Sequence, residues 1–307
     1  MTSIHKVVGM DPLALQNEGD WLSVWPYLGQ AKGGFLANVP SSWFKDFANR
    51  QDLAEICWRG LSRKAIIERL TALKNENGLI AVPHERKPGE HWEDIAPKVL
   101  GGDEHSVLVG KRGNQAGIPT FDDLAQDRFE ADNSAKPRTT DELVRILSPF
   151  LQNAGRVAFV DRHQYLDQRA FTKLMRKVVS EVTGKACHEI IIYAKHDPNR
   201  QYMSSLAATL SQMKEAFRGL KLPSYGIRYL SCDENVSDRP DDLHARRIVT
   251  NFCLITLQDS LVGWTRSQSI SRQTSRELLL LYQHHWLEGN HGLKIVIDAR
   301  LEETSPT

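Results

Sequence analysis

The sequence predicts an α/β protein, because short apolar runs alternate with helical patterns along its C-terminal half. The runs at 156–160 (RVAFV), 189–194 (EIIIYA) and 225–231 (YGIRYLS) have the length and composition of buried strands. Strands that alternate with helices form a parallel or mixed sheet covered on both faces. The fold class is therefore α/β, with a C-terminal mixed sheet flanked by helices.

The helices of this half each have a start signal. Thr140 is expected to cap a helix through Leu151, and Asp167 a helix from Gln168 to Val182. The second helix carries an apolar stripe at Phe171, Leu174, Met175, Val178 and Val182. Further helices are expected near 203–218 and within 275–288, and further strands at 243–257 and 293–299.

The N-terminal part has a different pattern. Residues 1–40 contain tryptophans and glycines without a clear period, which predicts irregular structure. Helical patterns follow at 41–61 and 62–74, and the stretch 79–92 (LIAVPHERKPGEHW) indicates a strand, a turn and a return strand. Two interpretations of this α+β part stay open: a winged helix-turn-helix that binds DNA, and a plain packing unit.

The domain boundary is expected where polar residues accumulate and the apolar period fades. This happens along 122–142 (DDLAQDRFEADNSAKPRTTDE), which Pro137 interrupts. The sequence thus predicts an N-terminal domain at 1–135 and an α/β domain at 136–307.

The bulk composition excludes several classes of protein. Lysine and arginine number 39 against 38 acidic residues, so the chain is not basic throughout and an anionic partner must meet a local patch. Four cysteines are scattered without metal-ligand spacing, which predicts buried free thiols, no metal site and no cofactor. No apolar leader and no run of eighteen apolar residues occur, so we expect a cytoplasmic protein with no membrane span.

The strongest site candidate is the segment 243–251 (LHARRIVTN). If this segment is one strand, period-two alternation puts His244 and Arg246 on the same face. An imidazole beside a guanidinium suits a phosphate group, and Asn251 follows His244 by seven residues. His244 and Arg246 therefore predict a phosphate-binding pair, within the pattern His-x-Arg-x4-Asn.

This pattern resembles the His-x-Lys-x4-Asp motif of the phospholipase D superfamily. The segments RVAFVDRHQYLD and DDLHARRIVTN are similar to the LHDRYI-type, MIT C-terminal-like domains found in eukaryotes and in bacterial defence-associated proteins. The resemblance covers about 154–298. It implies that His244 is the nucleophile or phosphate contact, that Arg246 clamps the phosphoryl group and that Asn251 orients the histidine.

The chain departs from the family pattern in ways that bear on turnover. Ala245, Arg246 and Asn251 stand where the family has aspartate, lysine and aspartate, and no second motif with the right spacing occurs. The resemblance thus implies recognition of a phosphodiester or nucleic acid in a multi-component bacterial defence or mobile-element system, with phosphodiesterase or nuclease activity that is degenerate or needs a homodimer. The alternatives are a non-catalytic scaffold for other proteins and a winged-helix DNA-binding protein.

Further polar residues are expected to contribute to the same site. Asp161 and Arg162 follow the first strand and Lys195 follows the second, so all three are candidates for phosphate binding. The helix from Gln168 presents a basic face that either tracks a phosphate backbone or is simply solvated. Its members are Arg169, Lys173, Arg176 and Lys177.

Overall fold

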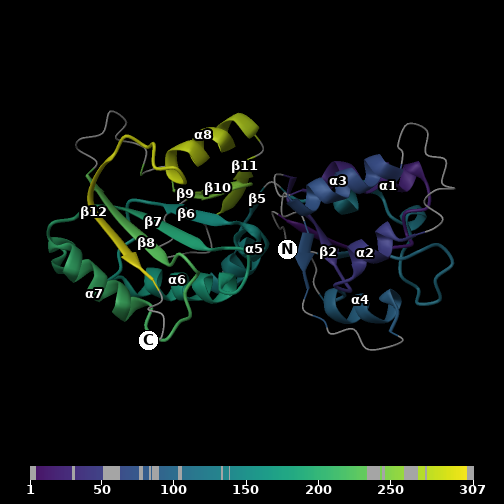
Figure 1. The fold of residues 1–307 in the computed structure, drawn as a ribbon, viewed down its shortest axis with the longest axis horizontal. Coiled ribbons are helices and arrows are strands. Elements are labelled where there is room, and N and C mark those ends of the chain that lie inside the picture. The colour runs from purple at the N-terminus through teal and green to yellow at the C-terminus, as the bar shows by residue number, and fades with distance from the viewer. Residues whose placement is uncertain are drawn as a thin grey trace. The chain divides into compact units, whose positions relative to one another are not determined.

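The chain folds into two compact units. The computed structural model describes residues 5–29, 32–50, 63–75, 79–82, 84, 90–102, 106–132, 134–137, 139–233, 243, 246–258, 269–273 and 275–302. Unit 1 comprises residues 3–132 and unit 2 residues 133–307. Each unit combines helices with its own sheet, so the expected α/β class is confirmed (Figure 1).

Unit 1 is built on a four-stranded parallel sheet in the order β3-β2-β1-β4. Its strands are β1 (Lys6–Met10), β2 (Gly34–Asn38), β3 (Leu79–Ala81) and β4 (Ser106–Val109). Its helices are α1 (Glu18–Val24), α2 (Trp43–Ala48), α3 (Arg63–Asn75) and α4 (Trp92–Leu100), with 3₁₀ turns at Trp25–Tyr27, Phe121–Asp123 and Gln126–Phe129. Helices α1 and α3 lie on one side of the sheet and α4 on the other (Figure 1).

Alternation along β1 explains why both faces of this sheet are covered. Val8 packs with Trp21 of α1 and Leu70 of α3, whereas Val7 packs with Ile95 of α4. A strand with apolar side chains on both faces must lie between two layers of helices. The polar groups of unit 1 therefore collect at the ends of its strands.

The structure of unit 1 differs from the α+β arrangement that the sequence predicts. The segment 1–40, expected to be irregular, contains β1 and β2, which are too short to show a period. The expected hairpin is wrong, because β3 pairs in parallel with β2 and Trp92 begins a helix instead of a return strand. The described residues of 79–102 thus form no winged-helix hairpin; the proposed turn residues Arg86 and Lys87 lie outside the described residues.

Unit 2 contains an eight-stranded mixed sheet in the order β12-β8-β7-β6-β9-β10-β11-β5. The strands are β5 (Ser134–Ala135), β6 (Arg156–Val160), β7 (Glu189–Lys195), β8 (Ile227–Asp233), β9 (Arg247–Thr250), β10 (Leu254–Leu257), β11 (Ile270–Gln273) and β12 (Lys294–Leu301). Strands β6, β7 and β8 are parallel, and the remaining neighbours pair antiparallel. The central β-α-β-α-β order predicted from the sequence is confirmed.

The helices of unit 2 cover both faces of its sheet. They are α5 (Thr140–Asn153), α6 (Arg169–Val182), α7 (Leu206–Ala216) and α8 (Arg276–Trp286), with a 3₁₀ turn at Gln201–Ser204. Helix α8 lies on the side opposite α6 and α7 (Figure 1). The predicted apolar stripe of α6 is buried throughout. The caps differ from expectation, since Thr139 caps α5 and Asp167 forms an ion pair with Arg200 instead of capping α6.

The expected single strand at 243–257 is wrong, because the chain turns back at residues 251–253 to form the hairpin of β9 and β10. The hydroxyl of Thr250 accepts hydrogen bonds from the backbone N–H groups of Phe252 (3.2 Å) and Cys253 (2.8 Å). A threonine that satisfies the backbone of a turn offers an alternative to a continued strand. The turn carries no glycine, so its sequence signal is weak.

A buried histidine marks the core of unit 2 on the α8 side. The ring of His291 stacks on Trp286 with centroids 5.3 Å apart and meets the edge of Tyr193. Its Nδ1 accepts a hydrogen bond from the N–H of Leu293 at 3.1 Å, which requires the neutral form. The pKa of His291 is lowered to about 4. Burial is the largest cause, and the nearby His285 and Arg228 lower the pKa further.

This lowered pKa predicts a specific loss of stability in acid. The unfolded histidine takes up a proton below about pH 6.5, whereas the folded one resists it until about pH 4. The contribution of the neutral His291 ring to the free energy of unfolding is thus complete above about pH 6.5. It falls by up to about 3 kcal/mol as the pH falls towards 4. Urea unfolding of the native chain and of His291→Phe should show a flatter pH dependence in the variant; equal slopes would contradict the burial of a neutral ring.

Candidate functional site

The candidate residues of unit 2 gather at the edge where the parallel strands β6, β7 and β8 end. Asp161 follows β6 directly, and Lys195 is the last residue of β7. Strand β9 runs antiparallel to β6 with Arg247 opposite Val160, so Arg246 also lies at this edge. Four predicted residues from three segments thus share one end of the sheet.

Backbone hydrogen bonds tie these segments together. The N–H of Arg162 donates to the carbonyl of Leu243, and the N–H of Lys195 donates to the carbonyl of Arg162, both at 3.2 Å. Strand β6 lies between the parallel β7 and the antiparallel β9, so the carboxyl ends of β6 and β7 meet the start of β9 at this edge. In open α/β sheets, ligands usually bind outside the carboxyl ends of the strands. We call the residues Asp161, Arg162, Lys195 and Arg246 the unit 2 edge.

The side chains of the unit 2 edge differ in how they are held. Asp161 is fully buried, and its Oδ1 accepts a hydrogen bond from the N–H of His163 at 3.0 Å. Arg162 and Lys195 are partly exposed. Arg246 donates from its guanidinium to the carbonyl of Gln258 at 3.3 Å. The buried carboxylate therefore shapes the loop, while the cations reach the surface.

Arg246 departs from the strand geometry that the sequence predicts. Its φ is 44°, and β9 begins only at the next residue. A non-glycine residue in this left-handed region costs roughly 1–2 kcal/mol, and such strain is concentrated at functional sites. The expected shared strand face with His244 is therefore wrong for Arg246. His244 itself lies outside the described residues.

Asn251 does not belong to the unit 2 edge. It lies at the far end of β9 from Arg246, a separation of ~15 Å for an extended chain. Its Oδ1 accepts a hydrogen bond from the N–H of Arg156 at 2.8 Å, at the start of β6. The strand places Asn251 at the opposite edge of the sheet from Arg246, so these two residues do not share a site, and the expected role of Asn251 towards His244 stays a prediction.

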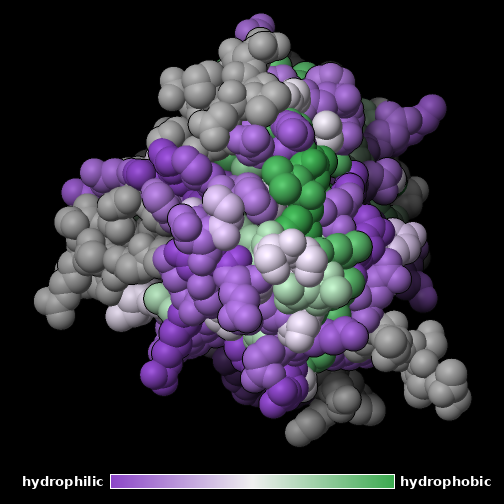
Figure 2. Space-filling view, turned by 90° about the vertical axis from the view of Figure 1, so that its left-hand side faces the viewer, coloured by the Kyte–Doolittle hydropathy of each residue, from purple (hydrophilic) through white to green (hydrophobic). Residues whose placement is uncertain are grey.

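A hollow of about 480 Å³ opens at the same end of the parallel strands, beside β12. His196 lines it, with its Nδ1 2.8 Å from the hydroxyl of Ser231, and Ser205 caps the start of α7 there. Leu206 and Val296 also line it and are exposed. Figure 2 shows the side of unit 2 with α7 and β12, where a hydrophobic strip is surrounded by hydrophilic surface.

The four basic residues predicted on α6 have divided roles. Arg176 donates to the carbonyls of Ala216 and Arg218 at the end of α7, and Lys177 forms an ion pair with Asp141 of α5. Arg169 and Lys173 are exposed and form no ion pair within the described ranges. All four line a hollow of about 600 Å³. Two of them hold helices together, which leaves two for a ligand.

Unit 1 contains a cavity of about 470 Å³ that sequence reasoning missed. Asp11 and Lys111, which follow β1 and β4, both line it. The signal for Asp11 was its place directly after the apolar run VVGM, the same signal that singled out Asp161. It was overlooked because β1 was not recognised as a strand.

The cysteines and the metal-binding residue types provide no reactive centre among the described residues. Cys187, Cys232 and Cys253 are buried free thiols, as expected, and burial raises the pKa of Cys187 and of Cys253 to about 12. No group of three or more His, Cys, Asp or Glu side chains in the described part of the chain is placed to hold a metal ion. Across the described helices, none is long and apolar enough to cross a membrane.

No protein-family model matches the chain, and no curated protein is significantly similar to it.

The placement of Asn251 predicts a structural effect without an effect on binding. Asn251→Ala removes the acceptor for the Arg156 N–H and should lower the free energy of unfolding by about 1 kcal/mol. Asn251→Asp keeps an acceptor there and should leave stability nearly unchanged. Neither variant should alter affinity for a phosphorylated ligand at the unit 2 edge. A loss of affinity without a loss of stability would place Asn251 in the site after all.

Proposed function

We propose that the chain is a phospholipase D-like protein whose unit 2 recognises a phosphodiester, with nucleic acid as the ligand class. The observation that carries the proposal is the convergence of Arg162, Lys195 and Arg246 at the edge where the parallel strands β6 and β7 end. Each cation comes from a different segment. A fold that brings three cations to one sheet edge suits an anionic ligand.

The hollow beside β12 gives additional support. The first turn of α7 leaves backbone N–H groups near Ser205 and Leu206, and a helix N-terminus favours negative charge. His196 adds an imidazole whose Nδ1 lies 2.8 Å from the hydroxyl of Ser231. Asp298 also lines this hollow, but its carboxylate is paired with Arg228 at 2.6 Å. The hollow can therefore extend an anion-binding surface from the edge.

Recognition is better supported than turnover. Asn251 lies too far from Arg246 to stabilise the charge of a histidine at this edge. Arg246 carries a planar guanidinium where the family motif has the ammonium group of a lysine. The role of His244 as nucleophile stays a prediction. We propose phosphodiesterase or nuclease activity only for a homodimer that brings two copies of the motif together, in the bacterial defence setting that the resemblance implies.

The proposal predicts salt-dependent binding that depends on the two arginines of the edge. A fluorescently labelled single-stranded oligonucleotide should bind the full chain, and Arg162→Gln or Arg246→Gln should each weaken binding about tenfold. The slope of log affinity against log salt should fall by about 1 for each phosphate contact removed. Fluorescence anisotropy over a salt series measures both quantities.

Lys185→Gln is the matched control, because Lys185 is exposed in the turn before β7, at the opposite end of the strand from Lys195. It should leave affinity and slope unchanged. Thermal unfolding of each variant separates lost binding from lost folding. Equal affinity for the native chain, the two arginine variants and the control would remove this site from consideration.

A second candidate is a non-catalytic scaffold that binds another protein. Leu278, Leu280 and Leu281 are exposed on α8, and the largest of these exposures is 55%. Apolar side chains grouped on one exposed helix are typical of protein contacts. Absence of oligonucleotide binding by the native chain, at low and at physiological salt, would favour this function over the first.

A further inference from the structure

The cavity of unit 1 lies where its parallel sheet reverses direction. Strand β1 has β2 on one side and β4 on the other, and the chain visits β3 before it crosses to β4. The cavity is lined by residues that follow β1, β2 and β4, and by the first turn of α4. Its volume of about 470 Å³ lies in the range of small-molecule sites. This is the switch point of unit 1.

Carboxylates dominate the polar lining. Of the described lining residues, four are acidic (Asp11, Asp46, Glu93 and Asp94), one is lysine and one is histidine. The lysine, Lys111, has its Nζ 3.4 Å from Oε1 of Glu93, so its charge is already compensated. Such a lining repels phosphate and carboxylate ligands and attracts a cation.

Asp11 is the lining carboxylate that a ligand in the cavity would contact. It is only 5% exposed, and its Oδ1 accepts a hydrogen bond from the N–H of Leu13 at 2.8 Å. Its second oxygen has no hydrogen bond or ion pair within the described residues, although the side chain lines the cavity. Burial raises the pKa of Asp11, while the Leu13 hydrogen bond, Lys111 and Arg50 act to lower it. The second oxygen is not among the buried side-chain atoms that lack a partner, so it is accessible and a donor in the cavity can reach it.

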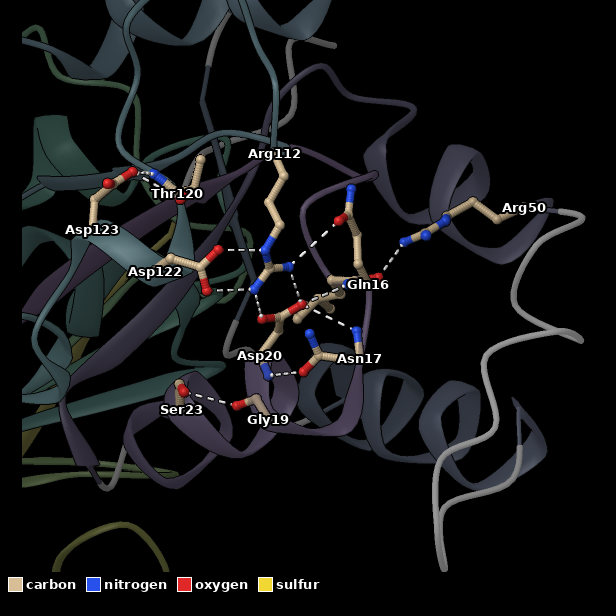
Figure 3. Close-up of polar contacts among 11 residues, drawn as sticks. Gln16, Asn17, Gly19, Asp20, Ser23, Arg50, Arg112, Thr120, Asp122 and Asp123 are labelled. Atoms are coloured by element: carbon tan, nitrogen blue, oxygen red, sulfur yellow. Dashed lines mark hydrogen bonds and ion pairs between the residues drawn. The ribbon is translucent and has the colours of Figure 1, made fainter.

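Two arginines of unit 1 that do not line the cavity are held by other contacts. Arg50 donates from its guanidinium to the carbonyls of Pro12 and Leu15, at 2.9 and 2.8 Å. Arg112, next to Lys111, donates both arms of its guanidinium to Asp20 and Asp122 (Figure 3). These contacts fix the loops after β1 and β4. The two arginine side chains do not line the cavity and do not occupy its volume.

We propose that this cavity binds a small organic amine, whose ammonium group donates hydrogen bonds to Asp11 while its carbon chain packs against Leu13, Pro40 and Trp92. An ammonium supplies a positive charge and N–H donors to a lining in which four carboxylates face one lysine. The apolar lining residues provide a surface for a short carbon chain. A metal ion is a poorer occupant, because no described group of three metal-ligand side chains is placed to hold one.

The test compares three molecules with the same four-carbon chain and different charge: 1,4-diaminobutane, 1,4-butanediol and butanedioate. Isothermal titration calorimetry with the full chain should show saturable binding of the diamine alone. Asp11→Asn should weaken this binding at least tenfold, because an amide keeps the acceptor for Leu13 but loses the charge. Leu13→Arg, at an exposed lining position, should weaken it as well by placing a competing cation at the cavity.

Glu68→Gln is the matched control, since it removes an exposed carboxylate of α3 that does not line the cavity. It should bind the diamine as the native chain does. Without ligand, Asp11→Asn should keep or raise the thermal midpoint, whereas a structural role for the carboxylate would lower it.

The inference is overturned if the diol or the dicarboxylate binds as tightly as the diamine, if Asp11→Asn binds normally, or if magnesium chloride displaces the diamine at an equal concentration. None of these outcomes depends on the oligonucleotide assay of unit 2, so the proposals for the two sites are tested independently.

Discussion

The whole structure depends on parallel strands that are buried on both faces. Strands β6, β7 and β8 in unit 2 and β1 and β2 in unit 1 carry apolar side chains towards helices above and below them. A strand in this position has no face on which a charged side chain can meet water. Charged residues therefore appear directly after the strands, as Asp11 does after β1 and Asp161 after β6. The same constraint that forms the core thus determines where polar chemistry can occur.

The two buried aspartates show how the neighbouring loop decides what that chemistry is. Both accept a hydrogen bond from the N–H group two residues later, to Leu13 and to His163. At Asp161 the adjacent loop brings Arg162 and Lys195 to the surface, so the local charge favours an anion. At Asp11 the lining adds further carboxylates, so the local charge favours a cation. Equivalent strand positions therefore lead to sites of opposite preference.

How much of this could be predicted from the sequence depended on how clear the apolar pattern of each element was. The unbroken apolar run EIIIYA and the apolar stripe of α6 are strong signals, and both elements were predicted with nearly correct bounds. Strands β1 and β2 include glycine in short runs without a clear period, so the parallel sheet of unit 1 was missed. The hairpin of β9 and β10 was read as one strand because its turn depends on a threonine hydroxyl, which has no distinctive spacing.

Strand β9 limits what the motif at 243–251 can do. The family resemblance assigned Arg246 and Asn251 to one catalytic set, but β9 lies between the two residues. The turn after Thr250 ties Asn251 to Arg156 at the amino end of β6, while Arg246 stays at the carboxyl end. Because a strand holds its two ends apart by about 3.3 Å for each residue, no side-chain rotation can bring them together. The cations of the unit 2 edge must therefore bind a ligand without help from Asn251, and this separation favours recognition over turnover within one copy of the chain.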